Sequence, residues 1–219
     1  MNIKKLKHCC LVIDVNVKVD GKSKNRRILS DPGSYSIEEH DKVKRVDIVL
    51  ITHEHKDHFH IESLKALVKR QPDVAVITND TVGDMLAKEG IEHHIMLDGN
   101  SVEVKGVKIE AYGKLHAMLH KSIPQSSNVG FFVEDKLFMP GDAYTDPKKS
   151  IDVLAIPTGG PWMKMSEAVD YGLGLKPRIS FPVHDAMNSA FMNEFIGKIL
   201  GQSGIEFVNL ENGGQLEVK

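Results

Sequence analysis

Apolar positions along the chain fall in short runs that are separated by polar residues and turn-forming dipeptides. Short runs rich in Val, Ile, Leu and Phe are typical of β-strands. They predict strands at residues 9–19, 27–29, 46–51, 74–77, 107–111, 129–133, 136–139, 151–156, 179–183 and 205–210. Several runs end in turn residues, as at Asp31-Pro32-Gly33 and Pro140-Gly141-Asp142, so the strands have defined ends.

A second pattern, in which apolar residues recur three or four positions apart, predicts helices. These helices cover residues 61–68, 81–88, 166–175 and 190–200. Strands dominate the first part of the chain, and helices alternate with strands from about residue 57 onward. The mixture favours an α/β sandwich of stacked layers over a doubly wound sheet, and it leaves the strand order open.

Composition narrows the picture further. The chain has 219 residues, of which 41% are hydrophobic and 26% charged, and it carries no repeat, low-complexity tract or Pro/Ser-rich linker, so we expect one domain over residues 1–219. The net charge of -2 gives no positive field, and we expect neither nucleic acid nor a membrane as a partner. Because no apolar stretch approaches about 20 residues, we expect a soluble, cytoplasmic protein. A homo-oligomer is compatible with these features.

The two cysteines, Cys9 and Cys10, are adjacent in a predicted strand and therefore point to opposite faces. They cannot supply a disulfide framework, and we expect buried free thiols rather than a redox or metal role.

The segment from Thr52 to His58 has the most informative spacing in the chain. It follows the apolar run 46–51 and contains the pattern His53-x-His55-x-Asp57-His58. In an extended segment His53 and His55 project the same way, with Cα atoms about 6.5–7 Å apart, which lets two imidazoles converge on one ion. Asp57 and His58 come as the chain turns toward a helix, where they can reach a second position. Imidazole and carboxylate suit zinc, iron, manganese or nickel, and no thiolate lies nearby in the sequence.

A solvated polar loop is the alternative interpretation of this histidine-rich segment. With 11 His and 16 Asp in 219 residues, a random order would produce the pattern with a probability of about 0.002. Metal binding is therefore the better hypothesis.

One short motif cannot complete two metal sites, so we expect further His or carboxylate ligands after other strands. His116, Asp142 and His184 each follow a predicted strand at a place where a loop can line a cleft. His120 is a rival for the position of His116, and we favour His116 because it lies nearer the end of its strand. We expect structural or solvated roles for His8, His40, His93 and His94, and a helix-surface role for His60.

With these residues in view, the whole chain resembles the metallo-β-lactamase superfamily. The resemblance rests on the Asp31-Pro32-Gly33 turn, residues 52–58, His116, Gly141-Asp142 and residues 182–185. It implies a four-layered αβ/βα sandwich and two metal ions per chain. The resemblance assigns one ion to His53, His55 and His116, a second to Asp57, His58 and His184, and a bridging role to Asp142. Residues 128–142 and 159–162 look more like the branch of uncharacterised metal-dependent hydrolases near the ascorbate-phosphate lactonases than like antibiotic-degrading lactamases.

Two ions about 3.5–4 Å apart can share a water, make it a nucleophile and polarise the bond that it attacks. We therefore expect a hydrolase with a metal-bridging hydroxide and two divalent ions, with zinc ahead of manganese, iron or nickel. Asp57 can orient the hydroxide while it binds the second ion. His120, Tyr144 or a metal-bound water can protonate the leaving group, and the sequence does not choose among them.

The resemblance implies a small ester, lactone or phosphoester as substrate. We expect it near residues 122–128 and 158–162, where Gly160 permits close approach and Trp162 offers an aromatic wall or a packing contact. Three alternatives stay open: a nuclease or RNA-processing enzyme, a diiron oxidoreductase and a non-catalytic metal-binding protein. The near-neutral charge and the length of the chain disfavour the first. His55, where diiron relatives typically carry a carboxylate, disfavours the second.

Overall fold

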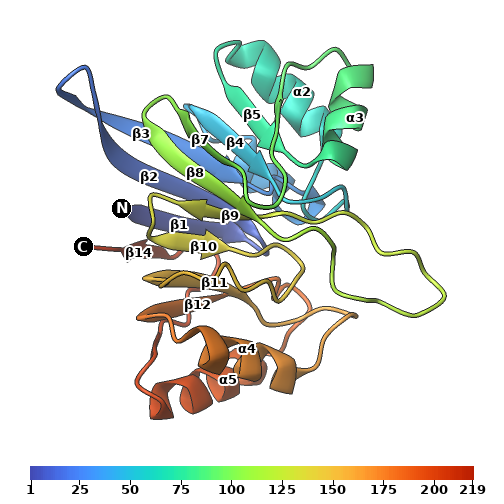
Figure 1. The fold of residues 1–219 in the computed structure, drawn as a ribbon, viewed down its shortest axis with the longest axis vertical. Coiled ribbons are helices and arrows are strands. Elements are labelled where there is room, and N and C mark those ends of the chain that lie inside the picture. The colour runs from blue at the N-terminus through green and yellow to red at the C-terminus, as the bar shows by residue number, and fades with distance from the viewer.

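Two β-sheets face each other in the centre of the molecule, and helices cover their outer faces (Figure 1). The computed structural model describes residues 1–219, apart from the side chain of Ala190. In Figure 1, α2 and α3 lie over the first sheet and α4 and α5 over the second. The result is a four-layered arrangement in the order helices, sheet, sheet, helices.

The first sheet has seven strands in the order β14-β1-β2-β3-β4-β5-β6. Its strands are β1 (Asn2–Lys7), β2 (Cys10–Val19), β3 (Lys22–Ser30), β4 (Ile48–Ile51), β5 (Ala75–Thr78), β6 (His94–Ile95) and β14 (Gln215–Glu217). The half from β14 to β3 is antiparallel, and the half from β3 to β6 is parallel. The accompanying helices are a 3-10 turn (Ser34–Ser36), α1 (Ile37–His40), α2 (Ile61–Arg70) and α3 (Asp80–Lys88).

The second sheet also has seven strands, in the order β13-β12-β11-β10-β9-β8-β7. Its strands are β7 (Ser101–Val104), β8 (Val107–Tyr112), β9 (Gly130–Val133), β10 (Leu137–Met139), β11 (Val153–Pro157), β12 (Ile179–Val183) and β13 (Glu206–Phe207). Strands β7 to β10 are antiparallel, and β10 to β13 are parallel. Helices α4 (Met165–Leu175) and α5 (Ala190–Gln202) pack on its outer face.

Three apolar layers hold these elements together. The central layer lies between the sheets and contains residues such as Leu50, Phe131 and Phe181, all fully buried. A second layer joins the first sheet to α2 and α3, and a third joins the second sheet to α4 and α5. Because both faces of the middle strands are covered, β4, β9 and β12 are buried at every position, which explains why Ser180 in β12 is the one polar side chain among them.

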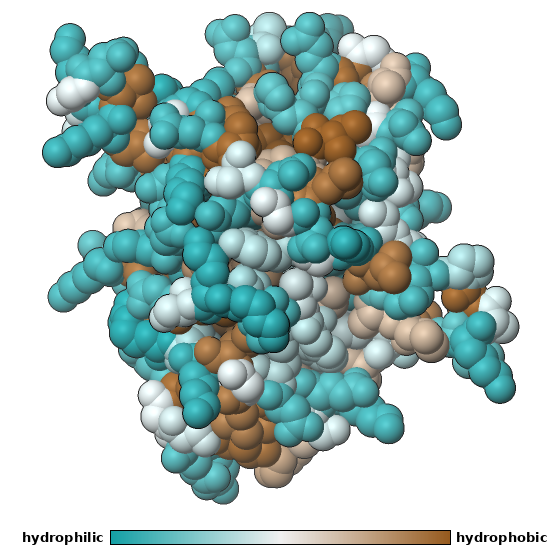
Figure 2. Space-filling model, in the orientation of Figure 1, coloured by the Kyte–Doolittle hydropathy of each residue, from teal (hydrophilic) through white to brown (hydrophobic). Residues whose placement is uncertain are grey.

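The outer surface seen in Figure 2 is mainly hydrophilic, with separate apolar patches. No helix among the residues described is both long enough and apolar enough to cross a membrane.

The predicted fold class is confirmed, and so are the principal strands and the four predicted helices. The apolar pattern did not reveal β1, β6, β7 or β14, which are short or rich in charged and polar residues. It also missed the first part of β3, because Lys22 to Arg26 pair with β2 in an exposed hairpin. The strand predicted at 205–210 is shorter, Glu206–Phe207. A single domain over residues 1–219 and a cytoplasmic location stay predictions.

Candidate metal centre

The predicted ligands follow strand ends that meet at one edge of the two sheets. His53 follows β4, Asp142 follows β10 and His184 directly follows β12. His116 lies beyond the end of β8, and its neighbour Ala117 donates its backbone N–H to the carbonyl of Asp142 at 2.7 Å. The two sheets are tied together here, because the Val129 N–H donates to Thr52 O at 3.1 Å.

Close backbone contacts shape the loops around this edge. At Gly33 a Cβ atom would lie 1.8 Å from the carbonyl oxygen of Asp57, so only glycine lets the chain pass the motif. Asn128 fixes the turn before Asp142, since its side chain accepts the Asp142 N–H at 3.0 Å and donates to Pro140 O at 2.9 Å. The loops therefore hold the predicted ligands on an ordered scaffold.

The first cluster consists of His53, His55, His116 and Asp142. Their ligand atoms all lie within 4.8 Å of one another. The ring centroid of His53 lies 4.7 Å from that of His55 and 5.1 Å from that of His116. Three of the four residues are buried, and His55 is partly exposed. The structure thus brings together the residues predicted for one ion.

The second cluster contains His58 and His184, joined by two residues that the motif does not include, His8 and Cys9. The carboxylate of Asp57 borders this cluster, with Oδ2 3.3 Å from His184 Nε2 and 3.9 Å from His58 Nε2. The three residues predicted for a second ion are therefore neighbours as well.

Asp142 lies between the clusters and touches both. Its Oδ1 is 3.0 Å from His58 Nε2, while its Oδ2 is 2.9 Å from His184 Nε2 and 3.2 Å from His116 Nε2. Because Oδ2 contacts a ring of each cluster, this carboxylate has the placement that a bridging ligand needs.

The hydrogen bonds on the far side of the rings determine which nitrogen faces the centre. In three of these rings, Nδ1 is hydrogen-bonded to an oxygen that can only accept. The pairs are His116 with Ala117 O, His184 with Gly159 O and His58 with Asp31 Oδ2. The Nδ1 atoms of these rings therefore carry protons, and Nε2 is the atom that can offer a lone pair to a metal.

Asp31 organises two of the rings at once. Its carboxylate accepts the Thr52 N–H at 2.8 Å and the Thr52 hydroxyl at 3.0 Å. The hydroxyl has only one proton, so it acts as acceptor for His53 Nδ1 at 3.0 Å. Asp31 therefore orients His53 of the first cluster through Thr52, and it orients His58 of the second cluster through a direct hydrogen bond to Nδ1. From the sequence we expected Asp31 only as part of the Asp31-Pro32-Gly33 turn.

Buried atoms without partners test whether a metal fits. Five such atoms face one another and have no hydrogen-bond partner among the described residues: Nε2 of His53, His58, His116 and His184, and Asp142 Oδ1. Buried polar atoms are normally satisfied, and leaving them alone costs free energy. A divalent cation satisfies this set of nitrogen and oxygen donors, so the residues fit a metal centre.

The electrostatics of the centre are strongly coupled. Burial lowers the pKa of His53 well below its usual value. Burial also opposes charge on His184, but Cys9 and Asp142 outweigh it and raise the pKa of His184 to about 11. For Asp142 the positive His58 overcomes burial and holds the carboxyl pKa well below its usual value. Without metal, the centre thus balances negative carboxylates against protonated rings.

Trp162 and Gly160 support the centre from the loop after β11. Trp162 is only 8% exposed, and its Nε1–H donates to Asp142 Oδ2 at 3.1 Å. At Gly160, where φ is +144°, a Cβ atom would lie 2.8 Å from Trp162 Nε1 and 3.1 Å from His184 Cε1. The loop therefore needs glycine at this position because the indole and the imidazole pass so close to the backbone. The loop lies as close to the centre as predicted, and Trp162 packs as well as lining the cavity.

A cavity of about 320 Å³ opens onto the centre. Its lining residues are Ser34, Tyr35, His55, Lys56, Asp57, His116, Leu119, Asp142, Pro161, Trp162, His184 and Met187. None of the residues 122–128, where we expected substrate, belongs to this lining, although Ser126 Oγ lies 3.3 Å from His55 Nε2.

The candidate proton donors lie outside that lining. His120 is exposed on the segment between β8 and β9, which extends away from both sheets in Figure 1, and its Nδ1 lies 2.7 Å from Ser122 Oγ. The Tyr144 ring lies 5.4 Å from that of Trp162, its hydroxyl is buried without a hydrogen-bond partner among the described residues, and burial raises its pKa. Of the two rival histidines, His116 is the one in the first cluster.

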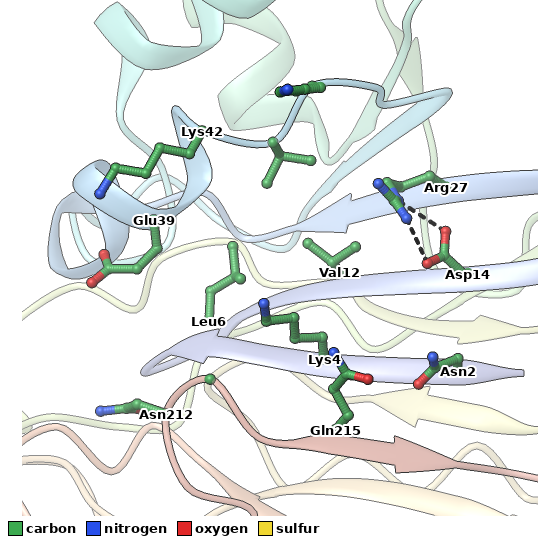
Figure 3. A pocket seen from close by; sticks show the side chains of 13 residues that line it. Asn2, Lys4, Leu6, Val12, Asp14, Arg27, Glu39, Lys42, Asn212 and Gln215 are labelled. Carbon is green, nitrogen blue, oxygen red and sulfur yellow. Dashed lines mark hydrogen bonds and ion pairs between the residues drawn. The ribbon is translucent and has the colours of Figure 1, made fainter.

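A larger cavity, of about 680 Å³, lies on the outer face of β1 and β2 beside α1 (Figure 3). Arg27 there forms a paired hydrogen bond with Asp14, at 2.9 and 2.8 Å, and Lys4 and Glu39 add charges of opposite sign. Its lining combines polar and apolar residues and includes no member of either cluster. We therefore place the chemistry in the smaller cavity.

One expectation is narrowed here and one is corrected. His8, which we placed among structural or solvated histidines, is 1% exposed and lies 3.2 Å from Asp57 Oδ2. A thiol does lie near the centre, because Cys9 belongs to the second cluster, while Cys10 belongs to the apolar layer between the first sheet and its helices. Both cysteines are free and buried, as expected. Sequence spacing could not show that residues 8 and 9 meet residues 57, 58 and 184.

Comparison with known proteins agrees with this geometry. A family model described as "Beta-lactamase superfamily domain" matches residues 2–184. Protein Rv0786c of Mycobacterium tuberculosis is 31% identical over 185 residues, which is 82% of each chain. A UPF0173 metal-dependent hydrolase of Methanocaldococcus jannaschii is 25% identical over 79% of this chain and 83% of its own.

Solved structures share the fold. A putative metal-dependent hydrolase from Parabacteroides distasonis superposes with a TM-score of 0.75 at 24% identity, covering 94% of this chain and 90% of that one. Igni18, a metallo hydrolase from Ignicoccus hospitalis, gives a TM-score of 0.70 at 19% identity with both chains fully covered. The chain therefore belongs to the metallo-β-lactamase superfamily, as shown by the match over residues 2–184 together with the sandwich of two sheets and the histidine motif after β4.

Proposed function

We propose that the protein is a metal-dependent hydrolase that holds two divalent ions and cleaves a small ester, lactone or phosphoester. One ion would be held by His53, His55 and His116, the other by Asp57, His58 and His184, with Asp142 between them. The observation that carries the proposal is the group of five buried, unpartnered nitrogen and oxygen atoms that face one another. The superfamily and the relatives named as metal-dependent hydrolases support the class of reaction.

When bound, the two ions supply a water acidic enough to be a nucleophile near neutral pH and polarise the oxygen of the bond that is cleaved. We expect zinc, because a set of imidazole and carboxylate ligands without a required thiolate suits it. Manganese, iron and nickel suit the same donors.

Asp57 is suited to orient the attacking water. Its side chain is 26% exposed and lines the cavity, whereas that of Asp142 is 3% exposed. Burial opposes its charge, but the neighbouring His184 and His8 side chains overcome this and hold the pKa of Asp57 well below its usual value. The carboxylate therefore stays ionised at neutral pH and can accept a hydrogen bond from water.

The leaving group would take its proton from water in the cavity. His120 is exposed on an extended segment, and the Tyr144 hydroxyl is buried with a raised pKa. Neither residue belongs to the cavity lining, so both are weaker candidates than water.

The cavity supports a small substrate. Its volume of about 320 Å³ is at the lower end for small-molecule sites. Tyr35, Leu119 and Met187 contribute apolar surface to the lining, and Lys56 is the single lysine or arginine in it. A small molecule that is neutral or carries one negative group, with an apolar part against Leu119 and Met187, matches this lining better than a polyanion does.

The test compares metal-loaded protein with metal-stripped protein on a panel of lactones, carboxylic esters and phosphoesters, with RNA and single-stranded DNA in parallel. We expect hydrolysis of at least one small substrate that disappears on chelation and returns when zinc or manganese is added back. Asp57→Asn should lower kcat by a larger factor than it changes KM, because it removes the orienting carboxylate. Efficient hydrolysis of nucleic acid with no small substrate turned over would contradict the proposal.

A further inference from the structure

His8 lies in a position that the superfamily motif does not explain. It is the first residue of the tight turn between β1 and β2, where Lys7 pairs with Cys10. Its φ is +57°, which is uncommon for a residue other than glycine, and it is 1% exposed. A strained backbone and a fully buried ring persist only where surrounding contacts hold them.

The hydrogen bonds of His8 assign its proton. Its Nδ1 accepts the backbone N–H of Ala186 at 3.3 Å. A neutral imidazole has one proton, so this acceptor role leaves the proton on Nε2, which lies 3.2 Å from Asp57 Oδ2. His8 is therefore placed to donate to the Asp57 carboxylate.

This proton position is the reverse of that in the neighbouring rings. In His58 and His184, Nδ1 donates to an oxygen and Nε2 faces the centre, as a metal ligand requires. In His8 the nitrogen that faces the centre carries the proton and has no lone pair for a metal. His8 thus belongs to the second cluster by distance, yet its chemistry is that of a hydrogen-bond donor.

We propose that His8 is a positioning residue, which donates a hydrogen bond from Nε2 to Asp57 Oδ2 and so fixes that carboxylate for the second metal ion. The inference rests on the proposed two-metal site. Asp57 needs such a donor, because its carboxylate is partly exposed at the cavity. With Oδ2 held by His8, the other lone pairs stay available to the ion.

The packing of the ring makes the arrangement rigid. The His8 ring centroid lies 4.2 Å from that of His184 and 4.7 Å from that of Tyr35. Through Ala186 the ring is also tied to the backbone just after His184. His8 therefore links two predicted ligands of the same ion, Asp57 and His184, and leaves the first cluster untouched.

Replacing His8 should weaken the binding of only one of the two ions. Partners that orient a metal ligand through a hydrogen bond typically contribute about 10–100-fold in metal affinity. We expect His8→Ala to weaken one binding step by about this factor and to leave the other within threefold of wild type. His8→Gln should recover much of the loss, because its amide N–H can donate to the same oxygen. His40→Ala is the matched control, since His40 is also buried but bonds to Ser36.

The experiment titrates metal-free protein with zinc in competition with a chromophoric chelator, and with cobalt while the visible spectrum of each site is recorded. Urea unfolding of the metal-free variants shows whether the fold is equally stable. The expected result is two steps in wild type, a selective loss of one step in His8→Ala and a partial return in His8→Gln.

Two results would overturn the proposal while leaving the two-metal site intact. One is a His8→Ala variant that binds both ions as wild type does. The other is a His8→Gln variant as weak as His8→Ala with an altered cobalt spectrum, which would make His8 a ligand. A wild-type protein that binds only one ion would instead overturn the two-metal proposal, and this inference with it.

Discussion

Asp31→Asn tests how far metal affinity depends on a residue that touches no metal. Asp31 is buried and accepts three hydrogen bonds, from the Thr52 N–H at 2.8 Å, the Thr52 hydroxyl at 3.0 Å and His58 Nδ1 at 2.9 Å. Asparagine keeps the shape but replaces one acceptor oxygen by an NH₂ group. Whichever way the amide is turned, at least one donor then faces another donor.

The expected loss of metal affinity can be worked out from the hydrogen bond that His58 loses. A hydrogen bond to a charged group contributes about 1.5–3 kcal/mol, and each 1.4 kcal/mol is about tenfold in an equilibrium constant. If His58 loses its orientation, the affinity for the ion it binds should fall by about 10–100-fold, in line with other residues that orient metal ligands. The Asp142 carboxylate, which contacts His58 Nε2 at 3.0 Å, should transmit part of the loss to the first cluster.

The assay is a zinc titration of metal-free Asp31→Asn in competition with a chelator, with urea unfolding as a check on the fold. Asp47→Asn is the control, because Asp47 also accepts a backbone N–H, from Arg27 at 2.8 Å, but lies outside both clusters. A folded Asp31→Asn protein that binds zinc within threefold of wild type would refute the reasoning.

Three further predictions concern other contacts of the centre. Lys5→Met should lower the free energy of unfolding by about 3 kcal/mol in a urea titration, because it leaves the Asp185 carboxylate without its buried partner at 2.6 Å. Trp162→Phe keeps an aromatic ring but removes the donor to Asp142, so chelator competition should show zinc affinity about tenfold lower. The raised pKa of His184, about 11, keeps its ring protonated without metal, so zinc binding must displace a proton. Affinity should therefore rise from about pH 6 to about pH 9, and calorimetry in two buffers of different ionisation enthalpy should detect proton release.

Much of the fold could be predicted from the sequence because burial dictates it. The run 46–51 is apolar at nearly every position, and the structure buries all of β4 within it. β1 could not be predicted in the same way, since Lys5 looks like a surface residue. Its Nζ is buried only because Pro182 O and Asp185 Oδ2, far away in the sequence, accept its hydrogen bonds.

In the metal centre, too, local sequence predicts some features, while others depend on residues that are distant in the sequence. Spacing alone indicates that His53 and His55 point the same way, because two residues apart on a strand share a face. No local rule says that His8 and Asp57 meet, as they lie in different loops, one between β1 and β2 and the other after β4, and 49 positions separate them. Nor does spacing distinguish His116 from His120: the choice depends on where the backbone leaves the sheet, and His116 N–H is fixed by Ser126 O at 2.9 Å.

The central claim is that one chain holds two metal ions in adjoining clusters, and metal stoichiometry tests it most directly. Metal-stripped protein would be saturated with zinc or manganese, freed of unbound ions and measured by elemental analysis against protein concentration. We expect about two ions per chain, because Asp142 Oδ1 and the Nε2 atoms of four buried histidines are otherwise left without partners among the described residues. A ratio that saturates at one ion or fewer would contradict the claim.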